Sequence, residues 1–199
     1  MTPERRTRIT NVLDRRQPDF TVVMENVHDP HNISAVMRTC DAVGIQEIYI
    51  LNTVISRHER FGKRSSASAA GWLTIHEFDN TEACFEALRK KGYKTFATHL
   101  GEQAHSLYEL KLTEPVALVF GNEHDGVTEE ALALCDGNFI IPQVGMVRSL
   151  NISVACAVSL YEGLRQRQEA GFYDAPRLPE AQRGALEELW GIIGDELIG

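Results

Sequence analysis

The sequence predicts an α/β fold with a mostly parallel sheet and helices on both faces. Short apolar runs typical of strands alternate with segments of helical periodicity along most of the chain. The 199 residues, 43% of them hydrophobic, are enough to bury one substantial core. The sequence contains no internal repeat and no low-complexity tract. We therefore expect one globular unit with appendages.

The chain opens with a basic segment that has helical spacing. The apolar residues Ile9, Val12 and Leu13 recur at intervals of a helix turn within residues 5–16. The residue before a proline is pushed out of the helical region, so this helix should stop near residues 17–18. The segment is therefore expected to form a basic N-terminal helix.

Strands and helices are expected to alternate after this first helix. The strand-like runs are rich in β-branched and aromatic residues, or alternate between apolar and polar positions as IQEIYIL does. The expected strands are residues 20–27, 45–51, 94–100, 115–121 and 139–142. The expected helices are residues 33–43, 81–91, 128–134 and 152–167. Such alternation favours parallel strands joined by crossover helices.

Two segments depart from the alternation. Residues 54–73 are small, polar and basic, and we expect a long, mobile functional loop there. After Gly171, two prolines indicate a connector to a last helix at about residues 180–197. The expected parts of the chain are the basic helix, the main α/β domain and the connector with its helix, at residues 1–17, 18–168 and 169–199.

The charge of the chain is unevenly distributed. The net charge of −8 argues against a nucleic-acid partner, because phosphate binding relies on Lys and Arg. However, residues 1–16 carry five arginines and two acids, whereas residues 174–199 carry six acids and two arginines. A second basic group lies in the expected loop and consists of Arg57, Arg60, Lys63 and Arg64. On charge alone, an ordinary solvated surface is the simpler interpretation.

Membrane and metal sites find no support in the sequence. No apolar run approaches the roughly 20 residues that span a bilayer, and the N-terminus lacks an apolar signal segment. We expect a cytoplasmic protein. The cysteines are scattered, without the spacing of zinc ligands, and are expected to be buried free thiols: Cys40, Cys84, Cys135 and Cys156.

Several common chemistries are excluded by their missing motifs. The run GNEHDGVT, residues 121–128, has the glycine spacing of a phosphate-binding P-loop, but Val127 stands where the lysine is required. Glu123 and Asp125 would also repel a triphosphate. No GxGxxG, HExxH or GxSxG motif is present. The sequence therefore offers no support for nucleotide hydrolysis, dinucleotide binding or the common hydrolase mechanisms.

Three loops with Gly, Asn and small polar residues follow expected strands, at residues 28–32, 121–130 and 141–153. In α/β sheets, ligands bind outside the carboxyl ends of the strands. Backbone amides and neutral polar side chains suit an uncharged or cationic ligand, such as an adenosine or a sulfonium, better than a phosphate. Asn151 is placed to cap the helix that follows it, and capping alone would explain that residue.

The three motifs together resemble a known family. HNISAVMRTCDAVG, VFGNEHDGVT and IIPQVGMVRSLNISVA resemble, in this order, the motifs of the SpoU branch of SPOUT methyltransferases. The resemblance is closest to TrmH-type tRNA guanosine 2′-O-methyltransferases and extends to about residue 180. It implies an α/β fold with a C-terminal deep trefoil knot that binds S-adenosylmethionine. It also implies a homodimer with active sites at the subunit interface, without a metal.

The resemblance also implies roles for individual residues. The implied catalytic residues are Asn32, Arg38, Glu123 and Asn151. The implied cofactor-binding residues are Thr98, Leu100, Gly121, Asn122, Ile141, Gly145, Ser149 and Leu150. The basic helix matches the tRNA-contacting extension of the family, and the expected RNA contacts are Arg5, Arg8, Arg15, Arg16 and Arg64. The chain departs from the family pattern at His124, Asp125, Gln143 and Arg148.

Arg38 is the family's candidate for activating the ribose hydroxyl. A 2′-hydroxyl is a very weak acid, so its proton must be removed or its developing negative charge stabilised during attack on the methyl group. A guanidinium is almost always protonated, so stabilising the charge and positioning a phosphate are easier roles than that of a base. In the stretch HNISAVMRTC we expect a buried face of Ile33, Val36, Met37 and Cys40. Asn32 is expected to cap the helix, and Asp41 to hold the Arg38 guanidinium.

Three functions remain open at this point. The first is 2′-O-methylation of the D-loop guanosine of tRNA at position 18, which the basic N-terminal helix favours. The second keeps the chemistry but acts on the tRNA wobble nucleotide or on ribosomal RNA. The third is a non-catalytic RNA-binding or cofactor-sensing module. The joint presence of the four implied catalytic residues argues against this third function.

Overall fold

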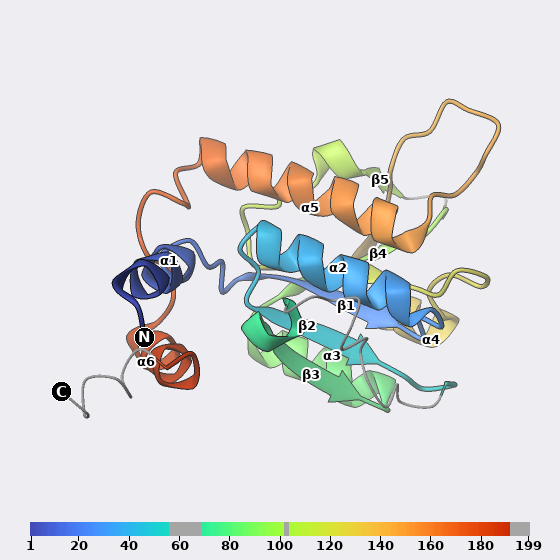
Figure 1. Ribbon diagram of the computed structural model, residues 1–199. Coiled ribbons are helices and arrows are strands. Elements are labelled where there is room, and N and C mark those ends of the chain that lie inside the picture. The colour runs from blue at the N-terminus through green and yellow to red at the C-terminus, as the bar shows by residue number, and fades with distance from the viewer. Residues whose placement is uncertain (56–68, 102–103, 192–199) are drawn as a thin grey trace.

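The computed structural model describes residues 1–55, 69–101 and 104–191. Its described part forms a seven-stranded sheet in the order β3-β2-β1-β6-β4-β7-β5, in which every pair of neighbouring strands is parallel (Figure 1). The strands are β1 (Phe20–Glu25), β2 (Glu47–Leu51), β3 (Thr74–Phe78), β4 (Lys94–Thr98), β5 (His105–Ser106), β6 (Val116–Phe120) and β7 (Gly137–Ile140). The helices are α1 (Pro3–Leu13), α2 (Pro30–Ala42), α3 (Thr81–Lys90), α4 (Glu129–Leu134), α5 (Ile152–Glu169) and α6 (Glu180–Leu189), with the 3-10 turns η1 (Ala69–Trp72) and η2 (Leu107–Glu109). The predicted α/β class is confirmed.

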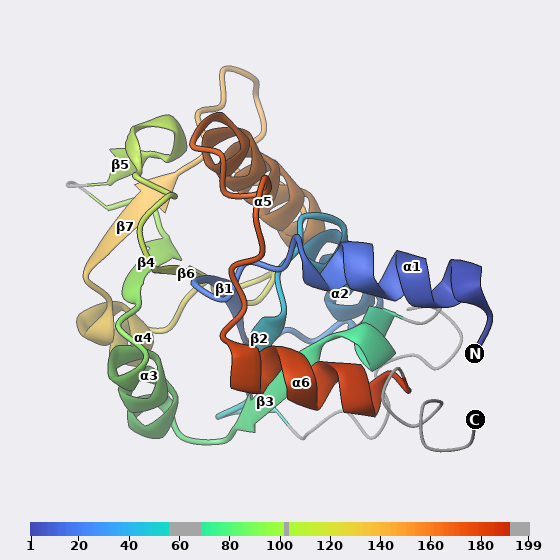
Figure 2. The ribbon, with the colours of Figure 1, turned by 90° about the vertical axis from the view of Figure 1, so that its left-hand side faces the viewer.

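Helices cover both faces of the sheet, as the alternation predicted. Helices α2 and α5 lie side by side on one face, and α3 and α4 lie on the other (Figures 1 and 2). Successive side chains of a strand point to opposite faces, so Val22 and Met24 of β1 join the core with α2 and α5, whereas Val23 joins the core with α3 and α4. The central strands β1 and β6 are buried on both faces, which explains their continuous apolar character.

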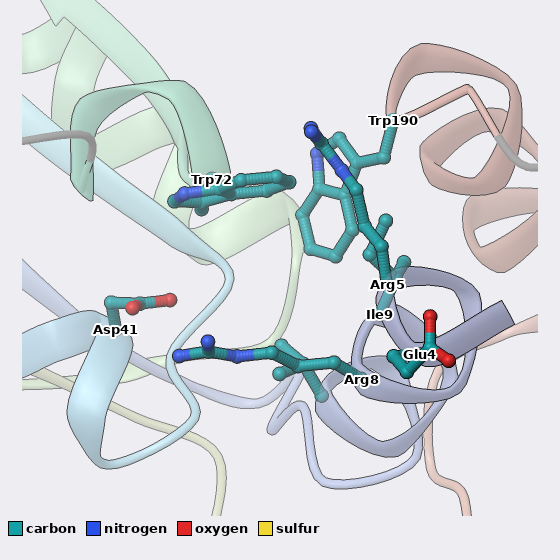
Figure 3. A pocket seen from close by; sticks show the side chains of 8 residues that line it. Glu4, Arg5, Arg8, Ile9, Asp41, Trp72 and Trp190 are labelled. Carbon is teal, nitrogen blue, oxygen red and sulfur yellow. The ribbon is translucent and has the colours of Figure 1, made fainter. Parts of the chain in front are cut away.

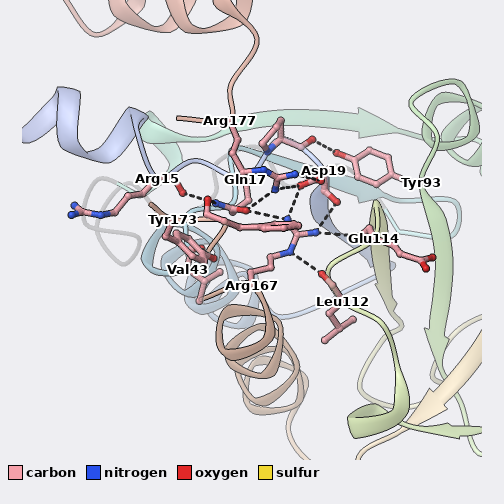
Figure 4. Close-up of polar contacts among 12 residues, drawn as sticks. Arg15, Gln17, Asp19, Val43, Tyr93, Leu112, Glu114, Arg167, Tyr173 and Arg177 are labelled. Carbon is pink, nitrogen blue, oxygen red and sulfur yellow. Dashed lines mark hydrogen bonds and ion pairs between the residues drawn. The ribbon is translucent and has the colours of Figure 1, made fainter. Parts of the chain in front are cut away.

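A buried arginine fixes the end of α5 to the start of β1. The Arg167 side chain is fully buried and donates to Asp19 Oδ1 at 2.6 Å and to the carbonyl oxygens of Leu112 and Glu114 at 2.8 and 3.1 Å (Figure 4). Arg177, in the connector after α5, donates to the other Asp19 oxygen at 2.8 Å. Burial acts to raise the pKa of Asp19, but the hydrogen bonds and charges of the two arginines outweigh it and lower this pKa. The carboxylate is therefore held ionised between two guanidiniums.

The five predicted strands are confirmed. Four of them have shorter bounds, and β7 begins and ends two residues earlier than predicted. Strand β1 ends at Glu25 because Asn26 adopts a left-handed conformation with φ of 50°. Strands β3 and β5 were not predicted: β3 is a half-exposed edge strand with polar residues, and β5 has two residues. Of the loop expected at residues 54–73, positions 56–68 lie outside the described residues, and its end forms η1 instead.

The terminal helices pack against each other at one end of the molecule (Figure 2). Helix α1 begins at Pro3 and is capped by the Thr2 hydroxyl. It ends at Leu13, earlier than predicted, because residues 14–17 turn toward the sheet and Gln17 forms a bridge to Ile45. Helix α6 ends at Leu189, since Gly191 follows in a left-handed conformation. The last part of the predicted helix, residues 192–197, lies outside the described residues. The division into residues 1–17, 18–168 and 169–199 stays a prediction.

The cysteines are free, as predicted. Cys40, Cys84 and Cys156 are buried and Cys135 is half-buried, and burial raises the pKa of each thiol. No helix in the described part of the chain is long and apolar enough to cross a membrane. The described residues also contain no group of His, Cys, Asp and Glu side chains suited to a metal ion.

Candidate functional site

A tight glycine-bearing loop follows β6 at the carboxyl end of the sheet. A Cβ atom at Gly121 would lie 2.0 Å from the carbonyl carbon and oxygen of Gly126, so only glycine fits there. Gly126 itself has a φ of +73°, which favours glycine. The Asn122 side-chain oxygen accepts from the backbone amides of His124 and Asp125 at 2.8 and 2.7 Å. These contacts hold residues 121–126 in one compact turn.

This loop forms one wall of a cavity of about 610 Å³. The other walls come from the ends of β4 and β7 and from the connection between β7 and α5. Its lining includes seven of the eight predicted cofactor-binding residues, namely Thr98, Leu100, Gly121, Asn122, Ile141, Ser149 and Leu150. The eighth, Gly145, belongs to the same connection but does not line the cavity. The predicted set therefore converges, although it comes from three separate segments.

Lining residues outside the predicted cofactor-binding set add shape and charge. Phe120 and Phe139 lie at the ends of β6 and β7, with ring centroids 6.2 Å apart. The charged side chains Glu123, Asp125 and Arg148 also face the cavity. Strand-end position was the signal that pointed to this region, but it could not show which neighbouring side chains turn inward. Apolar surface with a surplus of carboxylates suits an uncharged heterocycle joined to a cation.

A directional chain of hydrogen bonds joins three of the four predicted catalytic residues. Asn32 Nδ2 donates to Glu123 Oε1 at 2.7 Å, and Asn151 Nδ2 donates to Asn32 Oδ1 at 3.1 Å. Asn151 Oδ1 in turn accepts from the Ser153 amide at 2.8 Å, so Asn151 caps α5 as predicted. This chain ties the start of α2, the loop after β6 and the start of α5 into one unit.

The ionisation of Glu123 fixes the direction of this chain. Partial burial acts to raise the pKa of Glu123, but hydrogen bonds from Asn32 and from nearby backbone amides outweigh it and lower this pKa. The carboxylate therefore stays ionised near neutral pH and only accepts hydrogen bonds. It must receive the amide protons of Asn32, which leaves the Asn32 oxygen facing Asn151. Asn32 was predicted to cap α2, but this prediction is wrong. The cap is Asp29, whose side chain accepts from the amide of His31.

A second carboxylate binds Thr128, just after the loop that follows β6. The buried Glu25, at the end of β1, accepts from the Thr128 hydroxyl and amide at 2.5 and 3.0 Å. Burial raises the pKa of Glu25 in spite of these hydrogen bonds. Thr128 also caps α4 by accepting from the amide of Ala131. Nothing in the sequence pointed to this pair except the polar residue at a strand end.

Arg38, the fourth predicted catalytic residue, does not join this chain. It lies exposed on α2, does not line the cavity, and has no hydrogen-bond or ion-pair partner within the described segments. The buried face predicted for α2 is confirmed, because Ile33, Val36, Met37 and Cys40 are all in the core. The predicted contact between Arg38 and Asp41 is wrong. Asp41 Oδ1 instead accepts from Arg16 at 2.7 Å.

The predicted RNA-contacting arginines fall into three groups. Arg5, Arg8 and Arg15 are exposed, as an RNA contact requires. Arg16 was expected among them but is fully buried, where it donates to Asp41 and to the carbonyl oxygens of Ile45 and Trp72. It is therefore a structural residue in this chain, because its charge is already compensated. Arg64 lies outside the described residues.

Comparison with known protein sequences relates the chain to RNA methylases. The model of the SpoU rRNA Methylase family matches residues 19–161. The chain is 47% identical to a tRNA (guanosine(18)-2′-O)-methyltransferase of Thermus thermophilus over 188 residues, which cover 94% of this chain and 96% of that relative.

Solved structures show the same architecture. The fold matches the TrmH/SpoU tRNA modifying enzyme of A. aeolicus with a TM-score of 0.88 and 34% identity, covering 96% of each chain. It also matches the SpoU methyltransferase AviRb of Streptomyces viridochromogenes, solved in complex with AdoMet, with a TM-score of 0.67 and 27% identity. That match covers 77% of this chain and 62% of AviRb.

Proposed function

Because the chain belongs to the SpoU methylase family, we propose that it transfers a methyl group from S-adenosylmethionine to the ribose 2′-hydroxyl of a tRNA guanosine. The proposed nucleotide is the D-loop guanosine at position 18. One observation carries this assignment: a tRNA (guanosine(18)-2′-O)-methyltransferase is 47% identical along 94% of the chain, beyond the matched family segment. The ends outside residues 19–161 are thus also shared with an enzyme of this specificity.

The residues around the cavity fit the proposed cofactor. S-adenosylmethionine supplies a methyl group on a positively charged sulfur. Phe120, Ile141 and Leu150 provide apolar surface for an adenine, and Gly121 lines the same cavity. Glu123 contributes a negative charge that suits the sulfonium. Thr98, Leu100, Asn122, Gly145 and Ser149 complete the proposed binding set, as the family resemblance implies.

In the proposed reaction, the protein aligns the hydroxyl with the methyl group and steadies the charge that develops on the oxygen. Asn32, Glu123 and Asn151 hold the starts of α2 and α5 at the cavity. Arg38 supplies the positive charge near the ribose. The guanidinium acts as an electrostatic group rather than a base, because arginine side chains are permanent cations in proteins.

We infer that the active enzyme is a homodimer in which Arg38 serves the cavity of the partner subunit. Arg38 is exposed and outside the cavity of its own chain. The connection between β7 and α5 exposes Val144, Met146 and Val147 at 106%, 99% and 67%, next to cavity residues of the same segment. Apolar side chains with such exposure favour burial against another protein surface. A second copy there would bring Arg38 and the cavity together.

Mixing two inactive variants tests this arrangement. Arg38→Ala lacks the guanidinium, and Gly121→Val lacks the cofactor cavity. If Arg38 acts across the interface, each mixed dimer contains one complete site out of two. About half of the dimers in a co-refolded equal mixture are mixed, so the mixture should recover about a quarter of wild-type activity per total protein. If mixed dimers form but show no recovery, Arg38 acts within its own chain.

The remaining implied features belong to the same proposal. A C-terminal knot would account for the way α5 returns to α2, and the family resemblance implies it. Gln166 of α5 donates to the Leu110 carbonyl and accepts from the Leu112 amide, so α5 lies against the segment after β5. A cytoplasmic location is consistent with the proposed tRNA substrate.

The choice between RNA classes can be tested directly. Purified protein is incubated with S-adenosylmethionine labelled in its methyl group, in parallel with total tRNA and with ribosomal RNA. We expect label in tRNA alone. Label in ribosomal RNA alone would favour the alternative substrate, and absence of label from both would favour a non-catalytic RNA-binding module.

A further inference from the structure

We propose that a second cavity, between α1, α6 and η1, binds one unpaired nucleotide of RNA. The cavity measures about 520 Å³ and lies at the end of the sheet remote from the connection between β7 and α5 (Figure 1). Its lining residues are Glu4, Arg5, Arg8, Ile9, Val12, Asp41, Trp72 and Trp190. The ligand would be a nucleobase together with its phosphate, at a distance from the nucleotide that is methylated. The choice of RNA as its source rests on the proposed function.

Two indole rings form the wall for a base. Trp72 and Trp190 meet edge to face, with ring centroids 5.1 Å apart (Figure 3). Trp190 is fixed in place, since it is buried and the Arg16 guanidinium lies 5.5 Å from its ring centroid. Trp72 is only half-buried and keeps exposed surface. Aromatic side chains of this kind stack on unpaired bases without requiring a particular sequence.

Two guanidiniums supply the charge for a phosphate. Figure 3 shows Arg5 beside Trp190 and Arg8 extending across the cavity toward Asp41. Within the described segments, neither guanidinium has a hydrogen-bond or ion-pair partner. Arginine donors match phosphate oxygens in pairs, so two guanidiniums beside an indole surface fit a nucleotide better than an uncharged aromatic ligand.

The two acids of the cavity do not cancel this charge. Asp41 is already bound by Arg16 at 2.7 Å. Glu4 accepts hydrogen bonds from its own backbone amide and from Thr2, at the start of α1. Among the described lining residues, Arg5 and Arg8 are therefore the groups that can bind an anion. Buried Arg16 therefore has a defined role here: it neutralises Asp41 and orients Trp190.

Intrinsic fluorescence reports on this cavity alone, because Trp72 and Trp190 are the only tryptophans of the sequence. The full-length protein is titrated, without S-adenosylmethionine, with single-stranded oligouridylate of six nucleotides, with uridine monophosphate and with inorganic phosphate. We expect saturable quenching by the oligonucleotide, weaker quenching by the mononucleotide, and none by phosphate. Equal quenching by all three would mean simple anion binding, and would overturn the proposal, as would no quenching. Quenching by the mononucleotide alone would overturn the assignment to RNA.

Charge variants separate this cavity from general electrostatic attraction. Arg8→Gln should raise the Kd for the oligonucleotide about tenfold, whereas Arg8→Lys, which keeps the charge, should raise it less. Lys90→Gln removes the same charge from exposed α3, outside the cavity, and should leave the Kd unchanged. Equal losses in Arg8→Gln and Lys90→Gln would contradict a specific site. Circular dichroism confirms that each variant is folded. Since no methyl transfer is measured, a negative result here leaves the proposed enzymatic function intact.

Discussion

At the scale of single residues, the candidate site depends on a few side chains whose partners determine their roles. Glu123 is ionised and receives the amide protons of Asn32, which in turn accepts from Asn151. Arg38 differs from these residues, since it has no partner in the described part of the chain. A side chain that is not needed for folding can be replaced without structural loss, which makes Arg38 the cleanest test of chemistry.

Arg38→Ala should lower kcat by about 10²- to 10³-fold, because one preorganised charge near a developing oxyanion has an effect of this size. Binding of S-adenosylmethionine should stay within about twofold of wild type, since Arg38 lies outside the cavity. Calorimetric titration and single-turnover methylation measure the two quantities. A normal methylation rate in the Ala variant would remove Arg38 from the mechanism. Arg38→Lys should recover part of the rate, since it keeps the charge without the planar donors.

At the same scale, the sequence predicted which residues belong to the site better than it predicted which residues they contact. The family motifs placed Asn32, Glu123 and Asn151 in one site, and the structure joins them. The expected pairing of Arg38 with Asp41 failed because the competing cation, Arg16, comes from a segment 25 residues away. Helical spacing reports only neighbours on the same helix. A partner that arrives from another element can be found only once the fold is known.

At the scale of elements, loop geometry positions the site. The turn after β6 closes only because Gly121 has no Cβ atom. Gly121→Ala should therefore distort the turn and weaken S-adenosylmethionine binding at least about tenfold, as an overpacked site forces the backbone to move. Gly184→Ala on α6 is the matched control. Its Cβ would meet no atom within 4 Å, and alanine should stabilise the helix by about 0.5–1 kcal/mol.

Equilibrium dialysis for the cofactor and urea unfolding distinguish these two glycine variants. Unaltered cofactor binding by Gly121→Ala would show that the turn can move without loss of the site.

Alternation of strands and helices predicted the order of most elements, because burial on both faces leaves a strong apolar signal. It missed β3, since a half-exposed edge strand with His76 and Glu77 carries a weaker signal.

At the scale of the whole molecule, partly buried ion pairs link segments far apart in sequence. Asp19 binds Arg167 and Arg177, and Glu47 binds His76 and Lys91. Burial acts to raise the pKa of both acids, but these partners outweigh it. They lower the pKa of Asp19, and they lower the pKa of Glu47 to about 2. A lowered pKa in the folded state gives stability that is present above the unfolded-state pKa of about 4 and is lost as the pH falls toward 2.

Unfolding free energy should therefore fall as the pH is lowered from 5 to 2. Glu47 alone should contribute on the order of 2 kcal/mol to this loss. Urea unfolding at pH 7, 4 and 3 measures the effect, with Glu47→Gln as the comparison. The slope with pH should be smaller in the variant, and an identical slope would show that Glu47 does not contribute. Sequence reasoning could not identify these pairs, because Asp19 and Arg167 are 148 residues apart.

The central claim is methyl transfer to the 2′-hydroxyl of guanosine 18 in tRNA. Two tRNA molecules are compared that differ only at this nucleotide, one with a ribose and one with 2′-deoxyguanosine at position 18. Both are incubated with the protein and with S-adenosylmethionine labelled in its methyl group. We predict stoichiometric label in the ribose form and none in the deoxy form. Equal label in both forms would contradict the account, because the methyl group would then have been transferred to a different position.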